Sequence, residues 1–279
     1  MITCPDLDAA SVASHYDDLD RFYRDVWGEH LHHGLWLDGK EDTATAVRQL
    51  VDAVATRACA AGARVCDVGC GYGGTARILT EEYGATVTAL TISREQFEHA
   101  RAQNGAAANP EFLLRDWLAN DLPAGSFDSV IAVESLAHMV DKAAFFREAH
   151  RVLRPGGRLV VCAWLVAERP RRWQVHRLLL PICREGRLAG MGSACEYREL
   201  LAGAGFIEEE FHDWSRQVRR TWSVCAVRLL RRLLTRADYR RFLLDSRQTN
   251  RMFARSLFRI WLAYRCGVMR YGLLIGRKG

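Results

Sequence analysis

Short apolar runs and amphipathic stretches alternate along the chain between residues 60 and 165. Five apolar runs bounded by turn-forming residues predict β-strands, at 64–68, 86–90, 112–115, 128–133 and 158–164. The stretches between them repeat apolar residues at helical spacing and predict helices, at 75–83, 93–107 and 141–153. Strands that alternate with helices are typical of a parallel sheet covered by helices on both faces. The pattern therefore predicts an α/β fold with a doubly wound sheet.

The pattern changes after residue 168. Residues 168–192 are basic and irregular, and we expect no regular element there. Further on, the spacing predicts a helix at 195–202, a strand at 206–214, two amphipathic helical segments within 216–266 and a closing strand at 271–275. We expect three parts: an N-terminal helical lid (1–55), a ligand-binding core (56–167) and a C-terminal part (168–279). The last part completes the sheet and carries a helical insertion at about 215–266.

A glycine-rich turn follows the first predicted strand. The strand carries Asp67, and Gly69, Gly71 and Gly73 come before the helix. Glycine permits positive φ angles and lets a ligand approach the backbone closely. The N-terminus of the next helix offers unpaired N–H groups and partial positive charge to an anionic group. The turn is therefore predicted to bind a nucleotide-containing cofactor on a Rossmann-like sheet.

Two cofactors compete for this turn. Gly69, Gly71 and Gly74 satisfy the G-x-G-x-x-G pattern of NAD-dependent oxidoreductases. In those enzymes an acidic residue about 20 positions on binds the ribose hydroxyls, but here the second strand ends at Thr91 without one. Asp67 also stands inside the strand, where dinucleotide-binding strands usually carry an apolar residue. These departures disfavour NAD, and an NAD-dependent oxidoreductase stays the alternative from another enzyme class.

The segment from Val65 to Gly73 resembles motif I of class I S-adenosylmethionine-dependent methyltransferases. The resemblance implies that Asp67 faces the ammonium end of S-adenosylmethionine. It also implies that Gly69, Gly71 and Gly73 accommodate the methionine portion. The other donor-binding residues that it implies lie at successive strand ends: Thr91 and Gln96 for the ribose, Asp116 and Trp117 for the adenine, and Glu134.

Other segments resemble one branch of this family. Residues 32–36 (His-His-Gly-Leu-Trp) and 134–139 (Glu-Ser-Leu-Ala-His-Met) are similar to segments of tocopherol methyltransferases, and residues 91–96 to a segment shared with sterol C-methyltransferases and cyclopropane-forming enzymes. The likeness implies that His138 points into the acceptor pocket, with Glu134 as a second catalytic residue. An imidazole is suited to proton transfer near neutral pH. Tocopherol enzymes usually carry a second Glu before this His, and Ala137 at that position puts a tocopherol acceptor in doubt.

The acceptor is expected to be a large apolar small molecule. The residues expected to form its pocket are Tyr23, Trp27, His33, Trp36, Trp214 and Trp222. Aromatic faces stabilise the cation that forms when an alkene is methylated. With the resemblance, they favour C-methylation of a prenyl or terpenoid molecule in specialised metabolism, while O- or N-methylation of an aromatic or glycosylated natural product stays open. The arginine-rich C-terminal half would also suit a prenyl diphosphate.

Composition narrows the setting of the protein. The 279 residues carry a net charge of +6, divided into −9 over residues 1–168 and +15 over residues 169–279. A basic half can bind nucleic acid, but its apolar residues recur at helical spacing. We therefore expect these residues to be buried and expect no nucleic-acid partner.

The longest apolar run, 159–167, is too short to span a bilayer, and we expect no stable membrane anchor. Nine cysteines without a CxxC pair or a secretion signal favour the reducing cytoplasm and no metal site. The sequence leaves open whether the chain forms a homo-oligomer.

Overall fold

The computed structural model describes residues 1–4, 7–237 and 253–279. Its main sheet has seven strands in the order β4-β3-β2-β5-β6-β9-β8. In chain order these are β2 (Arg64–Val68), β3 (Thr86–Thr91), β4 (Glu111–Leu114), β5 (Phe127–Val133), β6 (Leu153–Val166), β8 (Phe206–Asp213) and β9 (Met269–Lys278). The first five run parallel, whereas β9 runs antiparallel to β6 and β8. The predicted α/β fold with a doubly wound, Rossmann-like sheet is confirmed.

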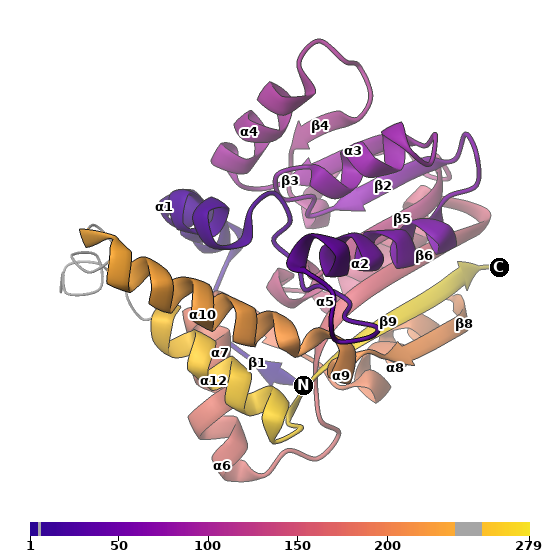
Figure 1. Ribbon diagram of the computed structural model, residues 1–279. Coiled ribbons are helices and arrows are strands. Elements are labelled where there is room, and N and C mark those ends of the chain that lie inside the picture. The colour runs from indigo at the N-terminus through magenta and orange to yellow at the C-terminus, as the bar shows by residue number, and fades with distance from the viewer. Residues whose placement is uncertain (5–6, 238–252) are drawn as a thin grey trace.

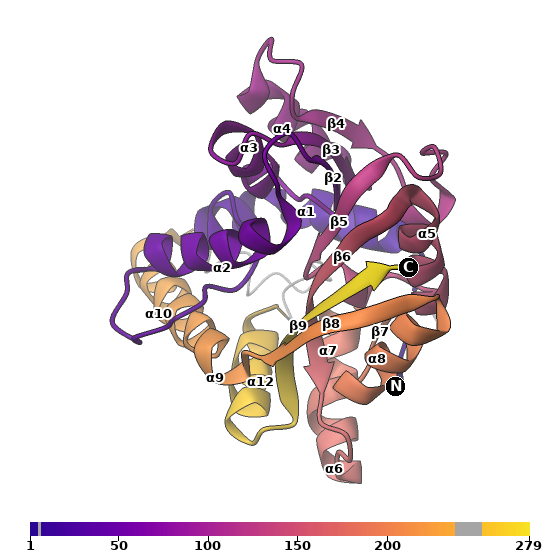
Figure 2. The same cartoon turned by 90° about the vertical axis from the view of Figure 1, so that its right-hand side faces the viewer.

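Helices cover both faces of this sheet (Figure 2). One face carries α2 (Thr43–Ala58), α3 (Gly74–Glu81) and α4 (Arg94–Asn104), and the other carries α5 (Lys142–Val152) and α8 (Ala194–Gly203). Side chains alternate between the two faces of a strand. Val65 and Ile131 accordingly point into one apolar cluster, and Cys66 and Val130 into the other. Strands buried on both faces explain the uninterrupted apolar runs in the sequence.

The helices begin where the local sequence allows it. Ser93 accepts a hydrogen bond from the Gln96 N–H and caps α4, and Asp141 caps α5 in the same way. In contrast, α3 follows Gly73, whose φ of 78° is in the left-handed region. A Cβ on Gly73 would lie 2.5 Å from the ring of Phe112, so the packing also requires glycine.

Residues 168–192 are not irregular, contrary to the prediction. They form α6 (Arg172–Gln174), a π-helical turn (Val175–Leu179) and α7 (Leu180–Glu185), followed by β7 (Gly190–Met191). β7 pairs with β1 (Ile2–Thr3), which the sequence pattern did not predict. A π-turn places an additional residue in one helical turn, so it disturbs the 3.6-residue spacing on which the prediction depends.

Helices from both ends of the chain gather over the carboxyl ends of the parallel strands (Figure 1). They are α1 (Ala9–Trp27), α10 (Arg220–Thr235) and α12 (Phe253–Arg265), with the short α9 (Ser215–Val218) before α10. Two amphipathic helices within 216–266 were predicted. Of the first 55 residues, α1 lies over the strand ends, whereas α2 packs on the sheet, and the expected boundary at residue 55 falls inside α2. Among the described residues, no helix combines the length and the apolarity that crossing a membrane requires.

Candidate active site

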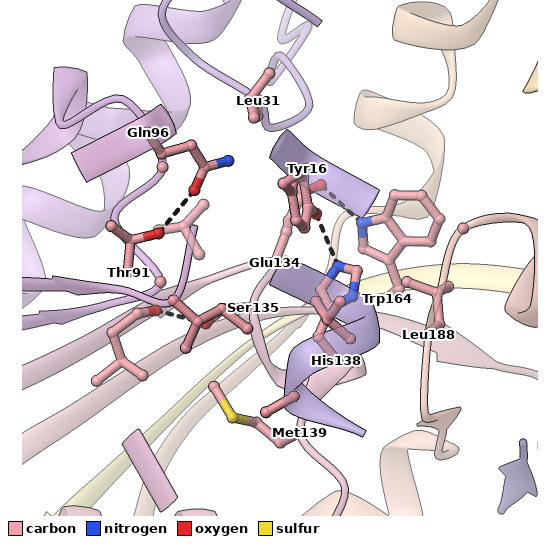
Figure 3. Close-up of a pocket in the computed structure, with 18 of the residues that line it drawn as sticks. Tyr16, Leu31, Thr91, Gln96, Glu134, Ser135, His138, Met139, Trp164 and Leu188 are labelled. Carbon is pink, nitrogen blue, oxygen red and sulfur yellow. Dashed lines mark hydrogen bonds between the residues drawn. The ribbon is translucent and has the colours of Figure 1, made fainter. Parts of the chain in front are cut away.

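A cavity lies where the carboxyl ends of the parallel strands meet α1, α7, α10 and α12 (Figure 3). Its volume of about 200 Å³ is far more than one buried water requires. Figure 3 shows Thr91 and Gln96 on one side of the cavity and His138 and Leu188 on the other. Ligands of open α/β sheets bind at this end of the strands.

The glycine turn forms part of the cavity wall. Gly69 and Gly71 line the cavity, with φ angles of 79° and 57°. A Cβ on Gly71 would meet no atom within 4 Å, so its bare backbone borders space that a ligand can fill. A Cβ on Gly69 would lie 2.4 Å from the Cβ of Ser135, so glycine there lets the loop after β5 approach the turn. Gly73, expected at the ligand, lies outside the lining residues and serves the helix packing described above.

Thr91 and Gln96, which the resemblance assigns to the ribose, meet at the cavity wall. The Thr91 hydroxyl donates to Oε1 of Gln96 over 2.8 Å and accepts from the Ser93 N–H. This hydrogen bond orients the amide, and Figure 3 shows the Gln96 amide nitrogen directed away from Thr91. Gln96 therefore offers an N–H donor to a ligand.

The buried carboxylate of Asp67 has an oxygen without a hydrogen-bond partner in the described structure. The residue is 2% exposed, and its Oδ2 is buried without a hydrogen-bond partner in the described structure. Burial raises the pKa of Asp67 to about 7. Asp67 is not among the lining residues, but it precedes Gly69, which is, by two positions. A cationic group bound at the turn would stabilise the ionised carboxylate.

Asp116 and Trp117 both line the cavity. Oδ1 of Asp116 accepts from the Leu118 N–H at 2.9 Å and starts a single turn of 3-10 helix. Trp117 is 2% exposed, and its Nε1–H donates to the carbonyl of Phe145. The indole of Trp117 is thus held in place by the core. The Asp116 side chain beside it lines the cavity and remains available to a ligand.

Glu134 is held by four donors from the protein. Its Oε1 accepts from the backbone N–H and the Nδ1–H of His33 and from the Tyr271 hydroxyl, and its Oε2 accepts from Nε1–H of Trp164 (2.7–2.9 Å). Burial alone would raise the pKa of Glu134, but the contacts with His33 outweigh it and lower the pKa to about 2. Glu134 also has a positive φ of 63°, which these bonds sustain. A carboxylate this acidic and this fully bonded is a poor proton acceptor, so the expected catalytic role of Glu134 does not fit the geometry.

His33 links this carboxylate to α10. The Nε1–H of Trp222 donates to Nε2 of His33 over 2.7 Å. Since an indole N–H can only donate, Nε2 carries the lone pair and Nδ1 carries the hydrogen that Glu134 accepts. His33 is fully buried and does not line the cavity, contrary to the prediction. It connects the segment after α1 to the sheet and to α10.

The remaining predicted pocket residues divide into two groups. Tyr23, Trp27 and Trp222 line the cavity. Trp36 and Trp214 do not. The Trp36 Nε1–H donates to the Thr221 hydroxyl, and Trp214 stacks on His212 beside β8. Both tryptophans pack the surrounding structure, because a buried aromatic residue in a core and one in a pocket wall have the same sequence signature.

Tyr16 and His138 form a hydrogen-bonded pair in the cavity wall (Figure 3). The Tyr16 hydroxyl and Nε2 of His138 are 2.9 Å apart, and Nδ1 of His138 is 3.0 Å from the carbonyl of Arg187. A carbonyl can only accept, so Nδ1 carries the hydrogen and Nε2 accepts from the phenol. Burial lowers the pKa of His138 to about 4, and the nearby Lys142 ammonium contributes. The imidazole is therefore neutral with its lone pair facing Tyr16.

The Lys142 ammonium holds the loop that carries His138. Its Nζ donates to the carbonyls of Ala137 and Met139, the two neighbours of His138. Lys142 is 5% exposed, and burial lowers its pKa to about 8. The ammonium thus fixes the turn (Leu136–His138) that presents the imidazole.

Two carboxylates of α1 hold this helix over the cavity. Oδ1 of Asp17 accepts from the Ser93 hydroxyl at 2.5 Å and from the Glu95 N–H, at the N-terminus of α4. Oδ1 of Asp20 accepts from the Tyr72 hydroxyl at 2.8 Å, next to the glycine turn. A carboxylate at a helix N-terminus is stabilised by the helix dipole. Helix α1 is thus anchored to the elements that line the Gln96 side of the cavity.

Within the described residues, no cluster of three or more His, Cys, Asp or Glu side chains is arranged to hold a metal ion. The histidines near the N-terminus instead bond to each other and to the chain: Nδ1 of His30 lies 3.1 Å from Nε2 of His32, and Nδ1 of His32 donates to the His33 carbonyl.

Comparison with known proteins places the chain in a family. Residues 66–161 match the model of the family described as "Methyltransferase domain". The chain is 34% identical over 221 residues to a 27-O-demethylrifamycin SV methyltransferase of Amycolatopsis mediterranei, across 78% of this chain and 81% of that protein. The chain belongs to the class I S-adenosylmethionine-dependent methyltransferases.

Two further comparisons describe this methyltransferase. It is 40% identical over 162 residues to a 2-methyl-6-phytyl-1,4-hydroquinone methyltransferase of Synechocystis, across 55% of this chain and 51% of that protein. The chain thus spans about half the length of that relative. Its fold matches a cyclopropane synthase of Mycobacterium tuberculosis with a TM-score of 0.85 over 99% of both chains, at 21% identity, which bears on the fold alone. The NAD-dependent alternative receives no support from these matches.

The donor side of the methyltransferase cavity fits S-adenosylmethionine. Open space borders Gly71, where a methionine portion can approach the backbone. The unpartnered Oδ2 of Asp67 suits a ligand ammonium, and the Gln96 amide suits ribose hydroxyls. Asp116 and Trp117 line the same cavity and suit an adenine. These residues are therefore the ones that would hold the donor.

Proposed function

We propose that this protein methylates a hydroxyl group of a large, mainly apolar small molecule, with S-adenosylmethionine as the methyl donor. The observation that carries the proposal is the neutral Tyr16–His138 pair in the cavity wall. A hydroxyl group must lose a proton when its oxygen gains a methyl group. The pair provides a route for that proton.

The donor, when bound, supplies an electrophilic methyl group on a cationic sulfur. The Tyr16 oxygen can accept a hydrogen bond from the acceptor hydroxyl while its own hydrogen bonds to Nε2 of His138. As the acceptor oxygen gains the methyl group it becomes strongly acidic, so a weak base suffices. The proton then passes to Tyr16 as the phenol hydrogen moves to His138. The Arg187 carbonyl keeps Nδ1 protonated throughout and stabilises the resulting imidazolium.

The cavity walls support an apolar acceptor. Apolar side chains from α7, α12 and the segment after α7 line it, namely Ile182, Leu188, Leu257 and Ile260. Such walls position an acceptor and exclude water from the reacting atoms. The substrates named for two relatives agree in kind, since a phytyl hydroquinone and a demethylated rifamycin are large molecules with hydroxyl groups.

A second candidate is the C-methylation of a prenyl or terpenoid acceptor that the sequence favoured. The aromatic rings of Tyr23, Trp27 and Trp222 line the cavity and could stabilise a carbocation. A diphosphate-bearing acceptor has less support. Arg115 is the only arginine or lysine among the lining residues of the described structure, so the expected arginine clamp is absent from that part.

The cellular setting belongs to the same proposal. All nine cysteines are free thiols, which supports a reducing compartment such as the cytoplasm. We also keep the three-part division as a proposal, with α1, α10 and α12 as the acceptor-binding lid over the sheet.

The test uses purified protein and donor labelled with carbon-13 at the methyl group. The acceptors are a prenylated hydroquinone, its fully O-alkylated analogue and a geranyl-type alkene. We expect label on the oxygen of the hydroquinone and none on the other two, read by mass and by carbon NMR. Label on a ring or alkene carbon would replace this proposal with the second candidate. Failure to bind the donor in calorimetry would overturn both.

A further inference from the structure

Helix α10 exposes an apolar stripe to solvent. Val227, Leu230 and Leu234 are 66%, 58% and 73% exposed, and their spacing of three and four residues places them on one side of the helix. The opposite side carries Trp222 and Cys225, which are buried. Helix α10 is therefore apolar on both sides, whereas a surface helix usually has a polar outer side.

Helix α12 packs beside α10 and continues this feature (Figure 1). Phe258 is 64% exposed and stacks on Trp261, and the guanidinium of Arg265 lies over the Trp261 ring. Exposed apolar residues that cluster on adjacent elements mark an interaction surface more often than scattered ones do.

The charge around the stripe identifies its partner. Between Trp214 and Ala237 the chain has seven arginines and no acidic residue. Arg231 lies exposed beside Leu230, whereas Arg232 and Arg236 contact Asp25 of α1. A helix with apolar and basic residues on its outer side suits a surface that is both apolar and anionic. Two copies of α10 packed together would instead bring arginines of like charge into proximity, which opposes self-association.

We propose that the outer sides of α10 and α12 dock this protein peripherally on anionic lipid bilayers. Val227, Leu230, Leu234 and Phe258 would enter the interface between headgroups and acyl chains, and Arg231 would contact the anionic headgroups. The docking does not depend on the proposed function. It deepens that function in one respect, because the inner sides of the same helices line the cavity through Trp222, Leu257 and Ile260, so an apolar acceptor dissolved in the bilayer would have a short path to the site.

The test is a vesicle flotation assay with the full chain. The probes are vesicles of phosphatidylcholine alone and of phosphatidylcholine with phosphatidylglycerol. The double variant Val227→Asp/Leu230→Asp is compared with the matched control Leu37→Asp/Ile207→Asp, whose residues are 60% and 53% exposed outside α10 and α12. Both variants remove two exposed apolar side chains and change the net charge by the same amount. Thermal unfolding and donor binding in solution verify that each variant is folded.

We expect the wild type to float with the anionic vesicles and much less with the neutral ones. We expect the α10 variant to lose partitioning by about tenfold or more, and the control to stay within about twofold of the wild type. The proposal is overturned if the wild type does not float with anionic vesicles, or if the α10 variant and the control bind alike. It is also overturned if light scattering shows a dimer that the α10 substitutions dissociate while no vesicle binding occurs, because the partner is then a second copy. Donor binding, and methylation of an acceptor dissolved in detergent, test the proposed function independently of membrane docking, since neither requires a bilayer.

Discussion

The phenol of Tyr16 donates a hydrogen bond to Nε2 of His138, a residue 122 positions away in the sequence. The bond joins the lid helix α1 to the loop after β5, at the wall of the cavity. It fixes which imidazole nitrogen can take up a proton, and it gives α1 a direct part in the proposed reaction.

Removing either member of this pair is expected to slow turnover. Tyr16→Phe keeps the ring but removes the hydroxyl, and His138→Ala removes the proton acceptor. We expect kcat to fall about a hundredfold or more in each variant, because general acid–base catalysis commonly contributes that much. The donor dissociation constant, measured by calorimetry, should change little. Tyr83→Phe is the matched control, since the Tyr83 hydroxyl bonds to Asp52 outside the cavity. Unchanged kcat in both pair variants would remove the pair from the mechanism.

The pH dependence of turnover follows from the low pKa of His138. An imidazole with a pKa of about 4 stays neutral down to that pH, whereas one with an ordinary pKa would be about nine-tenths protonated at pH 5.5. We therefore expect kcat at saturating donor to hold between pH 5.5 and 8, with its acid limb near pH 4. Lys142→Met removes a nearby cation and should move this limb to higher pH. A limb near pH 6.5 in the wild type would contradict the assignment.

Glu134→Gln is expected to lower the stability of the fold rather than to remove a catalytic group. The change replaces a carboxylate that accepts four hydrogen bonds, and it turns an amide group toward one of the donors. We expect a loss of about 3 kcal/mol in the free energy of unfolding, because the variant loses charged hydrogen bonds and leaves a buried donor unpaired; chemical denaturation measures it. The folded pKa of about 2 lies below the reference value of 4.5, so the ionised carboxylate stabilises the wild type above pH 4.5. That contribution is lost as the pH falls toward 2, and the variant should lack this part of the acid dependence.

Asp67→Asn should separate donor binding from stability. The folded pKa of about 7 lies above the reference value of 3.8, so the folded protein binds more protons than the unfolded chain between these values. The protein without donor therefore loses stability as the pH rises through that range. At pH 8 we expect the variant to melt at a higher temperature than the wild type, and to bind the donor about tenfold or more weakly. Scanning fluorimetry at pH 5 and pH 8, with and without donor, measures both. Equal donor affinity in the two proteins would show that Asp67 does not serve the ligand.

The anchor between α1 and α4 is expected to slow donor release. Asp17→Asn removes the charge that bonds to the Ser93 hydroxyl and the Glu95 N–H. We expect the donor to dissociate several-fold faster in stopped-flow displacement, because a charged hydrogen bond contributes about 1.5–3 kcal/mol. The neighbouring Asp18 is exposed, and Asp18→Asn is the control for charge alone. If both variants release the donor at the wild-type rate, the anchor does not restrain it.

Local sequence predicted the sheet well, and it located the glycine turn and the strand ends that border the cavity, because both depend on short-range patterns. Each of these features depends on a few consecutive residues. They are the alternation within each strand, the cap at Ser93 and the positive φ angles at Gly69 and Gly71. The pairing of Tyr16 with His138 depends on how α1 crosses the sheet, and no spacing in the sequence encodes that crossing.

The acceptor side was predicted less well for a related reason. Trp36 and Trp214 were assigned to the pocket on their aromatic character, yet they pack elsewhere. Trp164 looked like an ordinary strand residue, yet it lines the cavity and donates to Glu134. The sequence shows that a side chain is apolar or aromatic, whereas the long-range packing decides whether it faces a core or a ligand.

Tyr16 and Asp17 are consecutive residues of α1. Asp17 bonds the helix to Ser93 on the donor side of the cavity, and Tyr16 bonds it to His138. A rigid helix moves both at once. Any displacement of α1 that admits fresh donor, or frees the spent one, also withdraws the phenol from the imidazole. Under the proposed mechanism, the two residues of the proton route would therefore be separated during each exchange of donor, when water can enter the cavity.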